Sequence, residues 1–319
     1  MNMNKEIPQI WTGKESLAKI GNIDFKPEDS AEYKLVWNDE FDGDSLDPTK
    51  WSGNSQGCWN VDYAYTADSE HWRFENSIAT LSMTKLDKPD ANGKLYLDAY
   101  SFVTHEKMNF QYGYLEMRAK IPFFGKGEFP AFWLVSGHSA VARNAPDFKK
   151  RDCEVEIDIF ENFSSKNQVV PNLHKYENSE QRRHVQLSGI DQGASVNGTR
   201  TFSFESIEEA RKWHTYGFLW TKDIMSFSVD GKFYYTYNLN KNFGNFGSMD
   251  GFHQPLGIII SNQIFSAGWC KVNEWAASLG PAADEIFPLE YQVDYVRLYQ
   301  KEDGKIFINN NPDKSNLII

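Results

Sequence analysis

The chain has 319 residues, a formal net charge of −11, and 40% hydrophobic and 24% charged residues. These values exclude a fully disordered chain, because the apolar content is sufficient for a core. The acidic balance argues against general binding to nucleic acid or to an anionic membrane, since both require a basic surface. The three cysteines lie far apart in the chain, which argues against a structural zinc site and against a fully paired set of disulfides.

The sequence predicts one domain with an extension at each end. Residues 1–32 are polar, and we expect this N-terminal extension to pack on or beside the domain. Residues 33–300 form the domain, and residues 301–319 form a C-terminal tail or an added edge strand. No apolar run approaches the roughly 18 residues of a membrane span. The N-terminus lacks the apolar segment of an export signal, so either the protein stays inside the cell or its signal is not part of this sequence.

A two-residue period of apolar and polar side chains dominates the predicted domain. This period predicts strands in the following segments: 75–85, 112–122, 153–163, 225–239 and 293–300. Asp230-Gly231 divides the fourth segment into a hairpin, because Asp-Gly between alternating apolar residues favours a tight turn. Short strands at intervals of about ten residues indicate an all-β sandwich or barrel.

Helical patterns are few. Ser206 is positioned to cap a short helix within residues 206–214, and Glu209 is expected to complete a capping box. A second short helix is expected within residues 272–280, where it ends at Gly280.

Three carboxylates lie in the apolar segment 153–163, which reads CEVEIDIFENF. In a regular strand, Glu156 and Asp158 point to the same face, while Glu161 falls on the opposite face. One additional residue between Asp158 and Glu161, a β-bulge, returns Glu161 to the first face. We therefore expect a bulge here, with all three acids aligned along one strand.

Aligned acids have two interpretations. Repulsion and partial burial separate their pKa values, so that one group stays protonated near neutrality, as glycoside hydrolysis with retention requires. The alternative is a solvated strand face or a calcium site. The apolar residues between the acids argue against a strand that faces water on both sides, and Phe132 and Trp133 on a nearby segment offer a stacking surface.

Five blocks of the sequence, in order, resemble glycoside hydrolase family 16, which includes laminarinases, lichenases, agarases, carrageenases and porphyranases. The blocks are WNDEFDGDSLDPTKW (37–51), 112–137, EIDIFE (156–161), 213–237 and 287–300. The resemblance implies a jelly-roll sandwich of two curved antiparallel sheets with a sugar-binding cleft on the concave face. It also implies that Glu156 is the nucleophile, Asp158 the assisting carboxylate and Glu161 the general acid/base, with no cofactor for catalysis.

The resemblance further implies a set of substrate-binding residues: Trp133, Phe129, Arg118, Asn60 and His174. Phe129 departs from the family pattern, because laminarinase-like members usually have Trp there. Residues 255–269 replace a Gly-rich segment of typical laminarinases, and residues 136–153 form a long polar loop. The basic residues of this loop are Arg143, Lys149, Lys150 and Arg151. The loop is either a solvated surface loop or a wall of the cleft, where these residues would meet an anionic sugar.

Many members of the family bind a structural calcium ion away from the cleft. Glu40 and Asp294 match the segments that usually supply its ligands. The resemblance therefore implies a calcium site at these two residues.

The predicted function is that of a retaining endo-β-glycosidase acting on a polysaccharide or oligosaccharide. The first candidate substrates are β-1,3-glucan (laminarin) and mixed-linkage β-1,3-1,4-glucan, followed by an algal galactan (agar, porphyran or carrageenan) or a host glycan. A non-catalytic carbohydrate-binding module and a transglycosylase are the alternative classes. We expect a monomer that does not bind nucleic acid, located outside the cell, at its surface or in the periplasm, where polymeric substrates lie.

Overall fold

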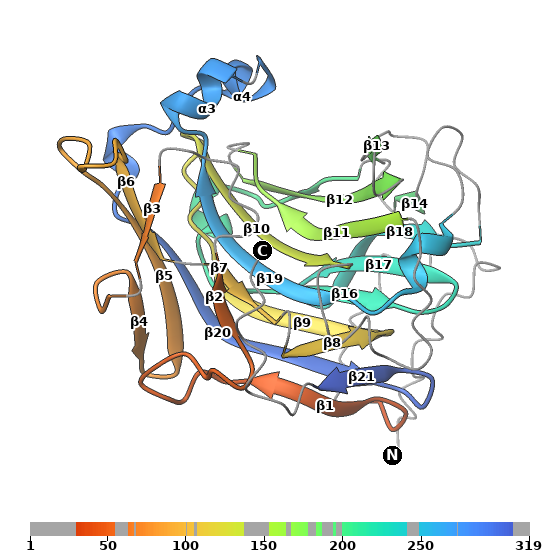
Figure 1. Ribbon diagram of the computed structural model, residues 1–319. Coiled ribbons are helices and arrows are strands. Elements are labelled where there is room, and N and C mark those ends of the chain that lie inside the picture. Colours follow the sequence, from red (N-terminus) through yellow and green to blue (C-terminus); the bar gives the residue numbers. More distant parts are fainter. Residues whose placement is uncertain are drawn as a thin grey trace.

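The computed structural model describes residues 30–54, 63–66, 68–99, 101–104, 107–136, 153–163, 167–177, 183–186, 194–195, 200–240, 249–272 and 274–308. In these ranges the chain forms two large β-sheets packed face to face, with few helices, which confirms the predicted jelly-roll sandwich (Figure 1). The strand pairs are antiparallel, except that β3 runs parallel to β6.

Over the described ranges, the larger sheet has eleven strands. Its main path runs in the order β14 (Ala194–Ser195), β18 (Lys232–Asn238), β17 (Ile224–Val229), β16 (His214–Trp220), β9 (Gly113–Lys120), β20 (Leu289–Gln300), β5 (Ile78–Lys85), β6 (Tyr96–Ala99) and β3 (Tyr63–Thr66). Two further strands join it, β1 (Lys34–Asp39) beside β20 and β4 (Trp72–Glu75) beside β5.

The smaller sheet has eight strands in the part of the chain that the structure describes. Its main path runs in the order β13 (Arg183–Gln186), β12 (Gln168–Glu177), β11 (Cys153–Glu161), β10 (Glu128–Val135), β19 (Gly257–Ile264), β7 (Ser101–Val103) and β2 (Ser52–Asn54), with β15 (Phe202–Ser203) also beside β12. A separate two-stranded sheet pairs β8 (Met108–Gln111) with β21 (Lys305–Ile308). The pairing of β21 with β8 shows that the C-terminal segment contains an added strand, which was one of the two forms predicted for it.

The remaining described elements are short helices. They are α2 (Ile207–Ala210), α3 (Ala267–Val272), α4 (Glu274–Leu279) and the 3-10 helices Asp250–His253 and Asp284–Ile286. None of these described helices has the length and apolar character needed to cross a membrane.

Local sequence patterns explain the ends of several elements. Asp230 and Gly231 both have positive φ, 51° and 76°, which is the backbone of the predicted hairpin turn between β17 and β18. Ser206 caps α2 as predicted, since its hydroxyl accepts from the Glu209 N–H at 3.0 Å. The predicted capping box is incomplete, because the Glu209 carboxylate pairs with Lys212 at 2.6 Å. Gly280, with φ of 82°, follows the end of α4 as predicted.

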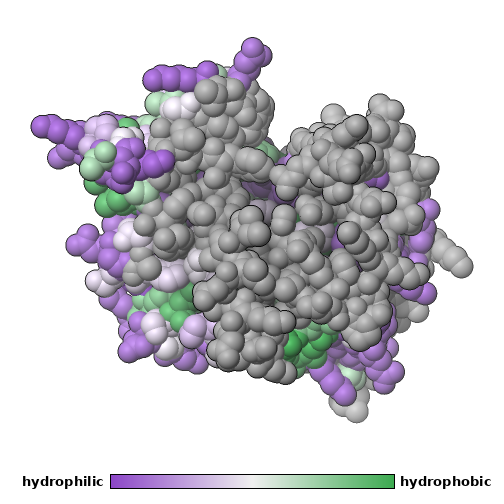
Figure 2. Space-filling model, viewed as in Figure 1, coloured by the Kyte–Doolittle hydropathy of each residue, from purple (hydrophilic) through white to green (hydrophobic). Residues whose placement is uncertain are grey.

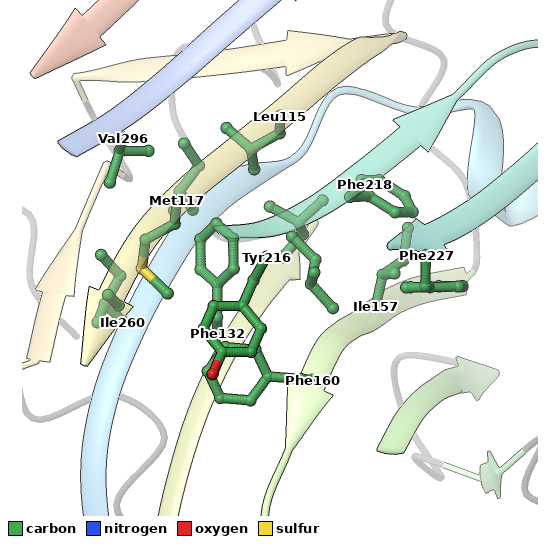
Figure 3. Close-up of a cluster of buried hydrophobic side chains, with 14 of the residues drawn as sticks. Leu115, Met117, Phe132, Ile157, Phe160, Tyr216, Phe218, Phe227, Ile260 and Val296 are labelled. Atoms are coloured by element: carbon green, nitrogen blue, oxygen red, sulfur yellow. The ribbon is translucent and has the colours of Figure 1, made fainter. Parts of the chain in front are cut away.

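Strand periodicity places the main core between the two large sheets. Leu115 and Met117 of β9 face Phe132 of β10 and Phe160 of β11 across this core, all of them fully buried or nearly so (Figure 3). Phe160 contacts Tyr216 of the larger sheet, with ring centroids 4.6 Å apart. This contact ties β11 to the opposite sheet. The visible described surface is mostly hydrophilic, with small hydrophobic areas (Figure 2).

We expect Gly217→Ala to destabilise the fold. A Cβ at Gly217 in β16 would lie 2.2 Å from the Tyr114 hydroxyl and 2.3 Å from Ser228 Oγ. Overpacking of this kind costs about 1–3 kcal/mol of unfolding free energy. Urea unfolding measures the loss. Gly43→Ala is the control, because its added Cβ meets only an ordinary contact of 3.4 Å with the Ser45 carbonyl. Equal stability of both variants would contradict the packing argument.

Candidate active site

The predicted β-bulge in β11 is present. Three residue steps in β11 correspond to two steps in β12, because the register joins Asp158 to Asn172 and Glu161 to Val170. The register also shifts on the other side of β11, where Trp133 of β10 pairs with Asp158 and Phe132 with Phe160. The extra residue confirms that Glu161 is returned to the face of Asp158.

This face is the outer one of the smaller sheet, since the alternate residues point into the core between the sheets. Cross-strand partners share a face. The residues that the register and strand alternation place on this face are Phe129, Ala131, Trp133, Glu156, Asp158, Glu161, Asn172 and His174. Strands β10 and β19 bend strongly, so this outer face is concave (Figure 1).

The acids form a compact cluster with His174 of β12. Nε2 of His174 lies 3.0 Å from Oδ2 of Asp158 and 3.9 Å from Oε1 of Glu156. Oδ2 of Asp158 is buried and accepts no hydrogen bond from the described residues, so its contact with His174 is a close approach without hydrogen-bond geometry. Asn172 donates from Nδ2 to Oε2 of Glu161, and Arg200 donates from Nη1 to Oδ1 of Asn172 at 2.7 Å.

Burial differs among the three acids, and it raises the pKa of two of them. Burial raises the pKa of Asp158 well above its usual range, and the charge of Glu156 raises it further. Burial and the charge of Asp158 likewise raise the pKa of Glu161, while His174 and the Asn172 amide partly oppose the rise. The Glu156 side chain is 20% exposed, against 3% for Asp158. The site therefore combines two buried acids, whose pKa values are raised, with a more accessible carboxyl group.

Two predicted aromatic residues line the same face. Trp133 lies opposite Asp158, is 8% exposed, and donates from Nε1 to Ser261 Oγ at 3.1 Å. Phe129 stacks on Phe163 and on Phe265, with ring centroids 5.2 Å apart in both pairs. Trp133 therefore adjoins the acids, whereas Phe129 belongs to a separate aromatic stack.

Arg118 is not part of this face, which corrects the prediction that it reaches the sugar. It lies on β9 of the larger sheet between Met117 and Ala119, which both point into the core. Its side chain therefore points to the outer face of that sheet. There it pairs with Asp294 and lies over the Trp213 ring, 5.0 Å from the ring centroid.

The structure argues against the predicted calcium site at Glu40 and Asp294. Arg297 donates two hydrogen bonds to Glu40, at 2.8 and 2.7 Å, and lowers the pKa of that carboxyl. Asp294 pairs with Arg118. Both carboxylates are thus neutralised by arginine. Among the described residues, the acidic group whose side-chain N and O atoms lie within 4.8 Å of one another is instead that of Glu156, Asp158 and His174.

Other predicted residues lie outside the described ranges. These are Asn60 and the basic residues of the long polar loop, Arg143, Lys149, Lys150 and Arg151. The sequence reasoning missed Asn172 and Arg200. Asn172 had a usable signal, since it lies two residues before His174 on the same strand and so shares its face. Arg200 had none, because it meets Asn172 from 28 residues away.

We expect Glu161→Gln to stabilise the fold progressively as pH rises. The raised pKa of Glu161 means that folding favours its protonated form. The contribution of this group to wild-type stability is therefore fully present below about pH 4 and is lost as pH rises through the raised pKa. A glutamine at this position does not titrate, so the variant does not lose this contribution to stability. Thermal unfolding from acidic to alkaline pH measures the difference in Tm. Glu75→Gln, at the exposed end of β4, is the control. A Tm difference independent of pH would contradict the prediction.

Comparisons with known proteins identify the family of the chain. A family model described as "Beta-porphyranase A-D, GH16 domain" matches residues 34–301. The beta-glucanase of Rhodothermus marinus is 28% identical over 278 residues, which cover 84% of this chain and 85% of that protein. Beta-porphyranase B of Zobellia galactanivorans is 26% identical over 213 residues, or 63% of this chain and 67% of that protein.

The fold is also shared with a solved structure. The laminarinase from Flavobacterium sp. UMI-01 superimposes with a TM-score of 0.58 at 27% identity, covering 84% of this chain and 100% of that one. The match to the family model spans most of the sequence, including the bulged strand and its neighbours. On these grounds the chain belongs to glycoside hydrolase family 16, in the group whose model describes the GH16 domain of beta-porphyranases A–D.

Proposed function

We propose that this GH16 endo-glycosidase hydrolyses a β-linked polysaccharide by a two-step retaining mechanism on the three acids of β11. The observation that supports the proposal is the bulge, which aligns Glu156, Asp158 and Glu161 on one concave face. The acids differ in burial, and a retaining glycosidase needs one ionised nucleophile and one protonated acid. In this scheme the carboxyl groups provide the nucleophile and transfer the protons, and water is the second substrate, so the scheme requires no cofactor.

In the first step, Glu156 attacks the anomeric carbon while Glu161 gives its proton to the departing glycosidic oxygen. This role of Glu156 is supported by its greater exposure, and that of Glu161 by its raised pKa. In the second step, Glu161 takes a proton from water, which attacks the glycosyl-enzyme and releases Glu156. Each step inverts the anomeric carbon, so the product retains the β configuration.

Asp158 and His174 assist these steps in our proposal. Asp158 lies between the two glutamates on β11 and orients Glu156. His174 lies opposite Glu156 and close to Asp158, where its charge when protonated would favour both carboxylates. Trp133, opposite Asp158, offers a sugar-stacking surface next to the bond that is cleaved.

The substrate class has two supported candidates. β-1,3-glucan or mixed-linkage β-1,3-1,4-glucan is supported by the beta-glucanase and laminarinase relatives. A β-linked galactan is supported by the porphyranase family model and by beta-porphyranase B. Since both polymers lie outside cells, we propose an extracellular, cell-surface or periplasmic location. We also propose that the enzyme is a monomer.

A panel of polysaccharides tests the substrate. We expect reducing-sugar release from laminarin and mixed-linkage glucan, or from agarose, porphyran or carrageenan, with mucin glycans as a further arm. Glu156→Gln is expected to abolish release from every polymer, because the nucleophile is lost. Products longer than the starting oligosaccharide would indicate transglycosylation. Binding without cleavage on every arm would contradict the enzyme proposal.

Azide products test the two glutamate roles separately. With an activated aryl glycoside, azide is expected to rescue Glu161→Ala and to give a β-glycosyl azide, because it attacks the glycosyl-enzyme without needing a base. Glu156→Ala is expected to give the α-glycosyl azide, because azide then replaces the nucleophile. On the polymer, Glu161→Ala is expected to lose about 10²–10⁴-fold in rate. Exchanged azide configurations would reverse the assignment.

Arg118→Met is expected to leave kcat and KM on the polymer unchanged, because Arg118 lies on the other sheet. Its ion pair with Asp294 is partly exposed, so the expected loss of stability is about 0–1 kcal/mol. Steady-state kinetics and urea unfolding measure the two effects. A raised KM with unchanged stability would return Arg118 to the substrate-binding residues.

A further inference from the structure

The side chains behind Glu161 form a chain of directed hydrogen bonds. Asn172 is 1% exposed and donates from Nδ2 to Oε2 of Glu161. Arg200 donates from Nη1 to Oδ1 of the same amide at 2.7 Å. Arg200 precedes β15, which pairs with β12 near its start, and its charge acts on Tyr237 of the larger sheet, where it lowers the pKa against the effect of burial. The network therefore connects the proposed acid/base to both sheets.

The chemistry of these groups fixes the direction of each bond. An asparagine amide has an accepting and a donating end of similar shape, so packing alone does not choose its orientation. A guanidinium has donors and no acceptor. Arg200 can therefore bind only the carbonyl end of Asn172, which leaves the NH₂ end for Glu161.

We propose that Arg200 and Asn172 are a positioning pair for Glu161: Arg200 orients the amide, and Asn172 reserves Oε2 of Glu161 as a hydrogen-bond acceptor. This inference rests on the proposed acid/base role of Glu161. A proton on Oε2 would confront the amide hydrogens, so the transferable proton is held on Oε1. In the first step Oε1 gives this proton to the glycosidic oxygen, and in the second step Oε1 takes one from water.

The pair also sets the pH range of the enzyme. Among the described residues, the charged groups around Glu161 are Asp158 and Glu156 on its own strand and His174 on β12, while the positive charge of Arg200 acts on Asp158. The Asn172 hydrogen bond lowers the pKa of Glu161, against the effect of burial. Loss of that bond raises the pKa and keeps the acid protonated to higher pH.

The first test is the pH profile of Asn172→Ala. We expect the alkaline limb of kcat/KM on the polymer to move to higher pH, with a fall of about 10–100-fold near the optimum, the equivalent of one hydrogen bond to a charged group. Hydrolysis of a dinitrophenyl glycoside of the same sugar should change little in its first step, because that leaving group departs without a proton. Asn172→Asp is a second variant, which keeps the shape of the side chain but cannot donate a hydrogen bond from its carboxylate. We expect its alkaline limb also to move to higher pH.

Asn262→Ala is the matched control. Asn262 is an equally buried amide, on β19, which donates to the Leu289 carbonyl at 2.9 Å and faces the core. The Asn262→Ala variant should have a lower Tm, but the alkaline limb of its kcat/KM profile should not move. An unmoved limb in both Asn172 variants, or an equal fall on polymer and aryl glycoside, would overturn the positioning role. This result differs from failure of the proposed function, in which Glu161→Ala itself shows no azide rescue.

A double-mutant cycle tests the part of Arg200. Arg200→Met should reproduce part of the Asn172→Ala effect on the alkaline limb, and the double variant should be no worse than Asn172→Ala alone, because Arg200 acts on Glu161 through the amide. Arg200→Lys, which keeps the charge and donors, should restore part of the wild-type profile. Independent, additive effects of the two substitutions would overturn the orienting role of Arg200.

Discussion

One extra residue in β11 decides where the third acid points, and the rest of the site depends on it. Because of the bulge, Ile159 and Phe160 both enter the core, although they are adjacent in sequence. Burial of a phenylalanine side chain contributes about 1.5–3 kcal/mol, and an unpaired carboxylate in the same core would be strongly unfavourable. The core therefore selects the bulged strand, and Glu161 joins Asp158 as a consequence of where Phe160 packs.

The site combines this packing with charge burial that works against stability. Asp158 and Glu161 lie almost completely out of water, and their mutual repulsion favours a shared proton over two charges. His174, Asn172 and Arg200 limit the penalty without removing it. Such an arrangement is typical of sites in which a protonated acid must act beside an ionised one.

Much of this site follows from strand parity alone. The period of two places Glu156 with Asp158 and puts Glu161 on the opposite face, and the expected bulge is the one extra residue that aligns all three acids. Parity groups Arg118 with Glu116 and Lys120 on the polar face of their strand, but it does not say to which sheet that strand belongs. The assignment of Arg118 to the sugar site came from the resemblance. Strand parity does not identify partners that come from distant segments. Only the tertiary structure shows that arginines pair with Glu40 and Asp294, and that Arg200 hydrogen-bonds to Asn172.

The pairing of β1 with β20 has a consequence for the order of folding. Lys34 lies opposite Gln300, so a strand from the beginning of the domain completes its ladder only against one of its last strands. At synthesis rates of about 5–20 residues per second, the intervening chain takes on the order of tens of seconds to emerge from a ribosome. During that interval the edge of β1 is unpaired in the nascent chain, and the larger sheet closes only after translation has passed β20.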